Sequence, residues 1–387
     1  TQQQEQEQER DTSNDEFVAI SVGCNKGFDA LNTLRMGTYD SSLSKRRWKR
    51  AMEHDGQKLH NAVCQQDQTK QFEVPTTNRR DNKLVIRGEM HCFEAMPQTA
   101  SRLAHTAEQL GYDKKGFRVI HAAVSKKIGT ALFETYETKE KNNIGVENKG
   151  LGNCLRMNEK NQKKYCSEVR VLTLREYVNE HMDNSNNARM KQSTTGTTQQ
   201  STEQKRTIHH LSIDVEGYDA DVLLGAGTDL LNRVEYLEFE YNWMGSWTHQ
   251  HLYDVVSYLD GSGKIYEAAN DGESETDSDS DARLSFTCYW AGQKRLWRIT
   301  GCWMRYYDIH TWANVACVNR RLVPKLAANM EAVFRTTLSE SYEGEGYRYR
   351  HRRWFRIVHN RNYKSTLAND PMLVTEPYEA LVSTEYL

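Results

Sequence analysis

The alternation of apolar and polar positions predicts a strand, a helix and a second strand between residues 211 and 242. Apolar residues alternate over 211–215, recur at roughly helical spacing over 220–231 and alternate again over 234–241. The helical stretch is interrupted by a Gly-Ala-Gly turn at 225–227. Two strands joined by a helix form a βαβ unit, which indicates a parallel sheet.

The same pattern predicts a strand, a glycine loop and a helix near the start of the chain. An apolar run over 17–22 ends in the sequence GCNKG, after which Phe28, Leu31 and Leu34 share one helical face. Downstream, the periodicity predicts a strand ending at Glu94, a helix over 99–110, a strand over 117–124, a short strand within 125–133, an edge strand entering a helix over 169–178, a helix over 252–259, an antiparallel pair over 284–290 and 295–300, and a helix over 322–338.

Polar tracts divide this pattern. Residues 1–15 are rich in Gln and Glu and offer no apolar surface to bury, which predicts a disordered tail. We predict one α/β domain over 16–318 and a C-terminal extension of unknown role over 319–387. The polar insertions that we expect within the domain lie near 36–87, 184–206 and 264–283.

Composition fits a core confined to part of the chain, because only 37% of the residues are hydrophobic and the mean hydropathy is −0.82. A net charge of −2 gives no electrostatic reason to expect nucleic acid or an anionic membrane as partner. Two basic runs containing aromatic residues, KRRWKR at 45–50 and GYRYRHRRWFR at 346–356, admit phosphate, sugar or nucleic-acid contact. A solvated helix face for the first run and a folded edge for the second are the simpler interpretations.

Eight cysteines lie scattered without the spacing of a zinc site, and no metal site is predicted. Cys24, Cys92 and Cys288 fall in apolar runs and are expected to be buried thiols; a Cys302–Cys317 disulfide is the alternative. No apolar run reaches transmembrane length and no signal peptide is visible. The chain begins at Thr1 without a methionine, which allows for a leader or anchor that has been removed. The expected compartment is therefore either the cytoplasm or, if there was such a leader, the secretory lumen.

The central unit also resembles a known family. Its sequence, SIDVEGYDADVLLGAGTDLL followed by VEYLEFEYN, resembles the signature of the FkbM-type family of S-adenosylmethionine (SAM)-dependent methyltransferases. That signature is an Asp-x-Glu-Gly strand end, a Leu-x-Gly-Ala helix and a strand ending in Glu. The resemblance implies a class I, Rossmann-like methyltransferase fold: a mostly parallel seven-stranded sheet with helices on both faces and an antiparallel C-terminal hairpin. The implied reaction is methyl transfer from SAM to a hydroxyl of a sugar, glycan or sugar-bearing metabolite.

The resemblance and the strand ends together point to a cofactor site. Gly23, Asn25 and Gly27 match the family motif Asp-x-Gly-Ala-Asn-x-Gly, although Ser21 stands in place of its acid. Glycines there would let the backbone approach a ligand closely. Glu94, at the end of the next strand, is the expected ribose ligand; an acid favoured by the dipole of a helix N-terminus is the alternative. Ala123, with its neighbour Ala122, is expected beside adenine or simply in the core.

An acceptor site is expected at the ends of the central strands. Asp214 would orient the acceptor hydroxyl or take its proton, while Glu216 and Glu240 would hold the substrate side of the pocket. A capping role is the alternative for either acid of the Asp-x-Glu-Gly motif. Asn148, in an Asn- and Gly-rich loop, and His249 are further candidates for substrate contact. His209 and His210 precede the strand and lie at its opposite end.

The resemblance implies a small-molecule or glycan acceptor and SAM as cofactor, and the near-neutral charge favours neither a nucleic-acid nor a membrane partner. Two other classes of protein compete with this interpretation. Ser21 and the long insertions favour a catalytically inactive binding or assembly module that keeps the fold. An NAD(P)-dependent oxidoreductase is disfavoured because the glycine loop lacks the third glycine of the GxGxxG fingerprint.

Overall fold

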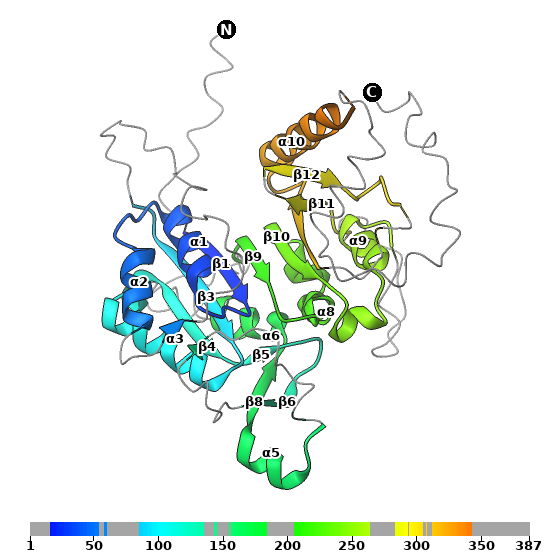
Figure 1. The fold of residues 1–387 in the computed structure, drawn as a ribbon. Helices are drawn as coiled ribbons and strands as arrows, with labels where there is room; N and C mark the ends of the chain where they lie inside the picture. The colour runs from blue at the N-terminus through cyan, green and yellow to red at the C-terminus, as the bar shows by residue number, and fades with distance from the viewer. Residues whose placement is uncertain are drawn as a thin grey trace, which may run out of the picture.

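The computed structural model of the chain shows an α/β protein built on one large sheet (Figure 1). The structure describes residues 16–53, 58–59, 85–134, 143–144, 154, 156–183, 205–263, 283–292, 294–304, 307 and 312–342. The polar tracts predicted at 1–15, within 184–206 and within 264–283 lie almost wholly outside these residues. Among the helices described, none is both long enough and apolar enough to cross a membrane.

The sheet has eight strands in the order β12-β11-β13-β10-β9-β1-β3-β4. Their bounds are β1 Phe17–Val22, β3 Gly88–Glu94, β4 Phe117–His121, β9 Ile208–Ile213, β10 Val234–Tyr241, β11 Phe286–Gly292, β12 Arg295–Arg298 and β13 Ala313–Asn319. From β4 to β10 all neighbours are parallel. The βαβ unit predicted at the centre is therefore confirmed as β9, α8 (Asp219–Leu231) and β10.

The expected seven-stranded sheet with a terminal hairpin needs correction. β11 and β12 do pair antiparallel, but β13 lies between that hairpin and β10 and is antiparallel to both of its neighbours. The sequence interpretation did not include β13, whose place in the sheet depends on long-range pairing with β10 and β11. The strand is covered on both faces of the sheet, because four consecutive residues, whose side chains alternate between the faces, are buried: Val315, Ala316, Cys317 and Val318.

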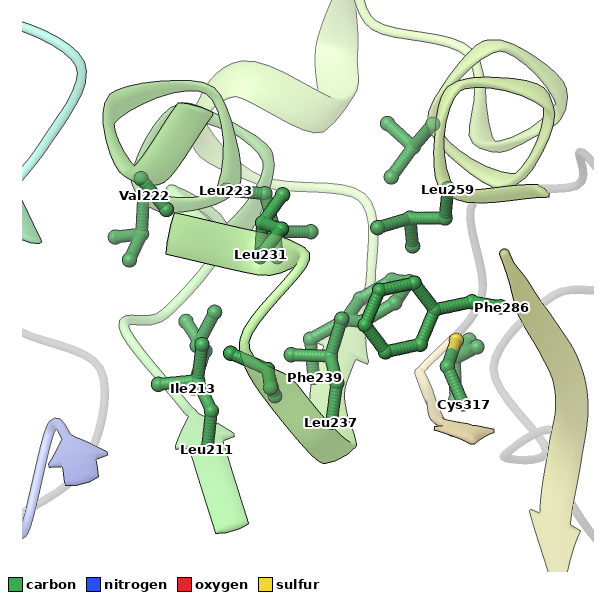
Figure 2. Close-up of a cluster of buried hydrophobic side chains, with 14 of the residues drawn as sticks. Leu211, Ile213, Val222, Leu223, Leu231, Leu237, Phe239, Leu259, Phe286 and Cys317 are labelled. Carbon is green, nitrogen blue, oxygen red and sulfur yellow. The ribbon is translucent and has the colours of Figure 1, made fainter. Parts of the chain in front are cut away.

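Helices cover both faces of the sheet, as predicted. Alternate residues of β1 enter different cores: Val18, Ile20 and Val22 belong to one cluster, and Ala19 belongs to the other. The first cluster includes α6 (Leu174–Val178), α8 and α9 (Leu252–Asp260). The second includes α1 (Phe28–Thr38), α2 (Lys45–Met52) and α3 (Pro97–Leu110). Figure 2 shows part of the first cluster, where Leu223 and Leu231 of α8 pack over Ile213 and Phe239.

The segment predicted as an insertion over 36–87 begins with residues of the packed body. α2 contains the basic KRRWKR run and is a helix, as expected, but Trp48 within it is fully buried and stacks on Tyr112 at a centroid distance of 6.1 Å. The Arg102 guanidinium of α3 donates to the carbonyl oxygens of Ala51 and Met52 at the end of α2. The basic side chains of the run are therefore exposed, and its one indole is buried in the core.

A smaller sheet follows β4. The strand predicted over 117–124 breaks at Ala122, so that β4 stays in the main sheet while β5 (Ala123–Val124) joins β6 (Gly129–Glu134) and β8 (Cys166–Leu172). With α5 (Glu159–Tyr165), β6 and β8 project beyond the main body (Figure 1). The remaining short elements are β2 Lys58–Leu59, β7 Asn143–Ile144, η3 Asp113–Lys115, η4 Asn179–Asp183 and η5 Gly245–Thr248.

The C-terminal segment starts with a helix that packs on this body. α10 (Pro324–Tyr342) contacts β12 and β13, and its Met330 and Phe334 belong to the first hydrophobic cluster. The helix predicted over 322–338 is therefore present. Residues 343–387, including the basic aromatic run at 346–356, lie outside the described part.

The cysteine predictions are largely wrong. Cys24, Cys92 and Cys288 are buried, but as disulfides rather than thiols: Cys24 bonds Cys92 and Cys288 bonds Cys317. The Cys302–Cys317 pairing is replaced because Cys288 faces Cys317 in the β11–β13 register, with their Cα atoms 4.0 Å apart. Cys302 is a free thiol. A third disulfide joins Cys154 to Cys166.

Candidate active site

Three predicted acids and the first glycine of the loop gather at the carboxyl ends of four neighbouring parallel strands. Glu94 ends β3, Gly23 follows β1, Asp214 follows β9, and Glu240 lies near the end of β10. In the sheet these strands are adjacent in the order β3-β1-β9-β10. The carboxyl edge of a parallel sheet is where α/β proteins bind ligands, because the loops there diverge and leave a crevice.

Backbone hydrogen bonds join the glycine loop to the end of β3. The amide of Asn25 donates to Oε2 of Glu94 over 2.8 Å, and the amides of Gly23 and Cys24 both donate to the carbonyl oxygen of Phe93 over 3.0 Å. The amide of Met96, the N-cap residue of α3, donates to Oε1 of Glu94 over 2.8 Å. Glu94 therefore holds the loop through Asn25. It also accepts a hydrogen bond at the N-terminus of α3, which is the alternative role predicted for this residue.

Burial dominates the electrostatics of Glu94. Its side chain is 6% exposed, and desolvation raises its pKa to about 7 although three backbone amides, those of Met96, Asn25 and Ala95, favour the charged form. The negative charge of Asp214 adds to the increase in pKa. A carboxylate has about four lone-pair sites, so the bonds from these three amides leave acceptor capacity for a ligand.

The glycines of the loop are required by protein packing. A Cβ built on Gly23, whose φ is +85°, would lie 1.8 Å from the carbonyl oxygen of Asp214. At Gly27, with φ +71°, a Cβ would lie 2.9 Å from Cδ2 of Leu103 and 3.0 Å from Cζ2 of Trp48. The Trp48 indole also donates to the carbonyl oxygen of Lys26 over 2.8 Å. These contacts explain both glycines without a ligand, and their part in cofactor binding stays a prediction.

Asn25 carries a polar atom suited to a ligand. The residue has a left-handed backbone, with φ 49°, and its Oδ1 is buried without a hydrogen-bond partner among the described residues. A buried acceptor without a donor is costly, and a bound ligand that donates a hydrogen bond would remove that cost. Ser21, which stands where the family motif has an acid, lies within β1 and is 8% exposed.

The turn after β9 positions Asp214 and Glu216. Asp214 is exposed, and its amide donates to the carbonyl oxygen of Val22 over 2.9 Å. Glu216 has a positive φ of 56°. The next residue, Gly217, touches the loop after β10: its carbonyl oxygen accepts from the amide and the hydroxyl of Ser246 over 2.9 and 3.0 Å. The two loops therefore meet through backbone atoms.

Glu240 is a buried acid beside the turn that carries Asp214 and Glu216. It is 7% exposed, and Oε2 accepts from the side-chain amide of Asn242 over 3.2 Å. Burial raises its pKa to about 9, with further contributions from the charges of Asp214, Asp219 and Glu216. Asp219 is fully buried, and desolvation followed by the charge of Asp214 raises its pKa well above the usual value. The predicted acids Asp214, Glu216 and Glu240 thus do lie together.

The other predicted residues lie less centrally. Ala123 belongs to the small sheet, where it pairs with Val171. His249 is exposed just after η5 and its Nδ1 lies 3.1 Å from the Thr248 hydroxyl. Asn148 lies outside the described residues. His209 and His210, predicted to precede the strand, instead lie within the first half of β9, and Nδ1 of His209 accepts from the amide of Val18.

Sequence reasoning missed Asp219, Asn242 and Ser246. Asp219 could have been noticed as an acid in the first turn of a helix that follows an acidic strand end, but its complete burial depends on tertiary packing. The roles of Asn242 and Ser246 arise from the crossing of two loops and have no local signal. Among the residues that the structure describes, no three His, Cys, Asp or Glu side chains are grouped so that they could hold a metal ion.

A parallel sheet with buried acids at its carboxyl edge defines an α/β protein with a ligand site at the strand ends. Residues 63–266, more than half of the chain, match the model of the methyltransferase FkbM domain, and the chain belongs to that family. The matched region includes Glu94, Asp214, Glu216 and Glu240. It excludes the loop over 23–27, which the structure nevertheless bonds to Glu94. No curated protein and no solved structure matches the chain.

Proposed function

We propose that the chain is a SAM-dependent O-methyltransferase that acts on a hydroxyl of a sugar, glycan or sugar-bearing metabolite. Family membership supports methyl transfer. One observation carries the assignment of the site: Glu94, Asp214 and Glu240 lie at the carboxyl ends of β3, β9 and β10 at one edge of the sheet, and the charge of Asp214 raises the pKa of the other two acids. Asp214 is exposed and lies between Glu94, on the cofactor side, and Glu240, on the acceptor side. The transferred methyl group would therefore pass close to Asp214.

The cofactor half consists of Glu94 and the loop that it holds. A carboxylate at the end of this strand can accept hydrogen bonds from both ribose hydroxyls of SAM. Oδ1 of Asn25 is a second buried acceptor at the same place, and it suits a hydroxyl or ammonium donor. When bound, SAM supplies an activated methyl group on a sulfonium. The residues fit such a ligand because the Glu94 carboxylate and Oδ1 of Asn25 can accept hydrogen bonds from the hydroxyl and ammonium groups of SAM.

The acceptor half prepares the hydroxyl. Asp214 is exposed and can reach a bound molecule, whereas Glu240 and Asp219 are buried. SAM would supply the methyl group to the acceptor oxygen, and the Asp214 carboxylate would take the proton that the acceptor hydroxyl loses. Because the displacement is in line, holding the hydroxyl at the correct angle supplies much of the rate. Glu216 and Glu240 flank this position and provide hydrogen bonds for neighbouring hydroxyls.

An exposed indole supports a sugar as acceptor. Trp243 is 54% exposed and directly follows Asn242, whose amide holds Glu240. The flat face of an indole packs well against the C–H face of a pyranose, while carboxylates and amides beside it bind the hydroxyls. Trp243 therefore offers an exposed apolar face one residue after Asn242.

The experiment is methylation of a panel of methyl glycosides, glycans and non-sugar alcohols with isotopically labelled SAM, followed by product mass analysis. We expect a mass gain of one methyl group on a sugar. Trp243→Ala should raise the acceptor KM about tenfold, the loss of roughly 1.4 kcal/mol of contact. Met36→Ala, which alters another exposed apolar side chain, on α1, should leave the KM unchanged.

Two outcomes would contradict the proposal. Calorimetric binding of NADH in place of SAM would indicate an oxidoreductase. Binding of SAM without a methylated product from any acceptor in the panel would favour the binding module.

A further inference from the structure

Asp219 is a buried acid with no assigned role in the reaction. It is the first residue of α8 and is fully buried. An ionisable side chain is rarely buried to this extent unless specific hydrogen bonds compensate for the loss of water. Its partners therefore indicate what the residue does.

The two oxygens of Asp219 bind amides from two different strand ends. Oδ2 accepts from the amide of Gly217, in the turn after β9, over 3.2 Å. Oδ1 accepts from the amide of Glu240, on β10, over 3.3 Å. One carboxyl group thus bridges the turn that carries Asp214 and Glu216 to the strand that carries Glu240.

This bridge lies where the two strands separate. Ile213 and Phe239 form the last pair between β9 and β10, and Glu240 is the next residue along β10. Beyond this pair the sheet no longer supplies a backbone partner from β9 to Glu240, and the Asp219 side chain takes that place. Gly217 is meanwhile fixed from its other side by the amide and hydroxyl of Ser246.

From this geometry we infer that Asp219 is a positioning residue, which fixes the spacing between the Asp214–Glu216 turn and Glu240. The inference rests on the proposed function only for its consequence in methyl transfer; the bridge itself can be tested without turnover. An acid suits the role because both of its oxygens accept. An amide in its place would direct an NH2 group at one of the two backbone N–H groups.

The test compares Asp219→Asn with Asp221→Asn. Asp221 is two residues further along α8 and pairs with Lys126 over 3.1 Å instead of bridging the strands. Four properties are measured. Hydrogen exchange is followed at the amides of Gly217 and Glu240, and the Glu240 carboxyl is titrated by carbon-13 NMR, assigned with Glu240→Gln. SAM affinity is measured by calorimetry, and kcat and KM are measured with an acceptor from the panel.

In Asp219→Asn we expect at least one of the two amides to exchange about tenfold faster, the effect of losing one hydrogen bond. The titration midpoint of Glu240 should fall, because a neighbouring acid has been removed. SAM affinity should stay within about twofold, since the cofactor half is untouched. With an acceptor from the panel, kcat should fall more than KM rises. Asp221→Asn should change none of these.

The inference is overturned if both amides and the Glu240 titration are unchanged in Asp219→Asn, or if amides throughout the sheet exchange faster by the same factor. Should Asp219→Asn fail to fold, Ser246→Ala provides the second variant. It removes a bond on the other side of Gly217 and leaves the bridge, so the amides of Gly217 and Glu240 should stay slow; faster exchange at both would show that Asp219 does not hold them. Absence of methyl transfer in the wild-type chain would refute the proposed function and leave the exchange result valid.

Discussion

The two halves of the site use the same functional group in opposite ways. On the cofactor side, a single buried acid, Glu94, is hydrogen bonded by backbone amides, and its pKa is raised only to about 7. On the acceptor side, Glu240 lies among three other acids and burial raises its pKa to about 9. Backbone donors offset the cost of burying a carboxylate, whereas neighbouring carboxylates increase it.

This difference separates the roles of the acids. Near neutral pH Glu94 can change its charge when a ligand arrives, but Glu240 keeps its proton and can donate a hydrogen bond. Asp214 is the exposed acid between them, and its charge acts on both. This arrangement is the reason that we propose Asp214 as the acid that accepts a proton from the acceptor.

The junction between the halves can be broken at Gly23. A Cβ there would overlap the Asp214 carbonyl oxygen at 1.8 Å, so Gly23→Ala should lower the free energy of unfolding by about 3 kcal/mol or more. The matched control is Gly111→Ala, which has a similar φ of +66° but meets nothing within 4 Å; it should cost about 1 kcal/mol. Urea unfolding measures both, and equal losses would show that the contact with Asp214 does not matter.

The acceptor half can be disabled alone. Asp214→Asn should lower turnover roughly 100-fold because it removes the group that takes the hydroxyl proton. SAM affinity should change little. Steady-state rates with the acceptor and calorimetry with SAM measure the two effects. Near-normal turnover would eliminate the assignment and direct attention to His249 and His251.

The affinity of the cofactor half for SAM should change with pH near neutrality, well above the range in which an ordinary carboxylate titrates. Because the pKa of Glu94 in the folded protein is about 7 rather than 4.5, the acid is protonated at pH 6 and must lose that proton to accept two ribose hydrogen bonds. SAM affinity should therefore fall about tenfold per pH unit below 7. Calorimetry in buffers of different ionisation enthalpy would detect the released proton. An affinity independent of pH between 5.5 and 8 would contradict this role.

Much of this site could be predicted from local sequence. The alternation of apolar residues located β1, β9 and β10, and a strand end followed by an acid identified Glu94, Asp214 and Glu240. The eighth strand and the disulfide partners could not be found in this way, because β13 reaches its place between β10 and β11 only through long-range pairing. The bridge made by Asp219 depends on the crossing of two loops. The reason for Gly23 was also inaccessible, since its close neighbour lies almost two hundred residues away in the chain.

The most direct measurement is calorimetric titration of SAM into the wild-type chain, Glu94→Gln and Glu240→Gln at pH 8. Both acids are buried and lie at the carboxyl ends of strands in the parallel part of the sheet, so a difference between the two variants shows to which half each acid belongs. We predict that Glu94→Gln binds SAM at least about tenfold more weakly, a loss of roughly 1.4 kcal/mol, while Glu240→Gln stays within about twofold of the wild type. Equal affinities for Glu94→Gln and the wild type, or an equal loss in both variants, would contradict the division of the site into a cofactor half and an acceptor half.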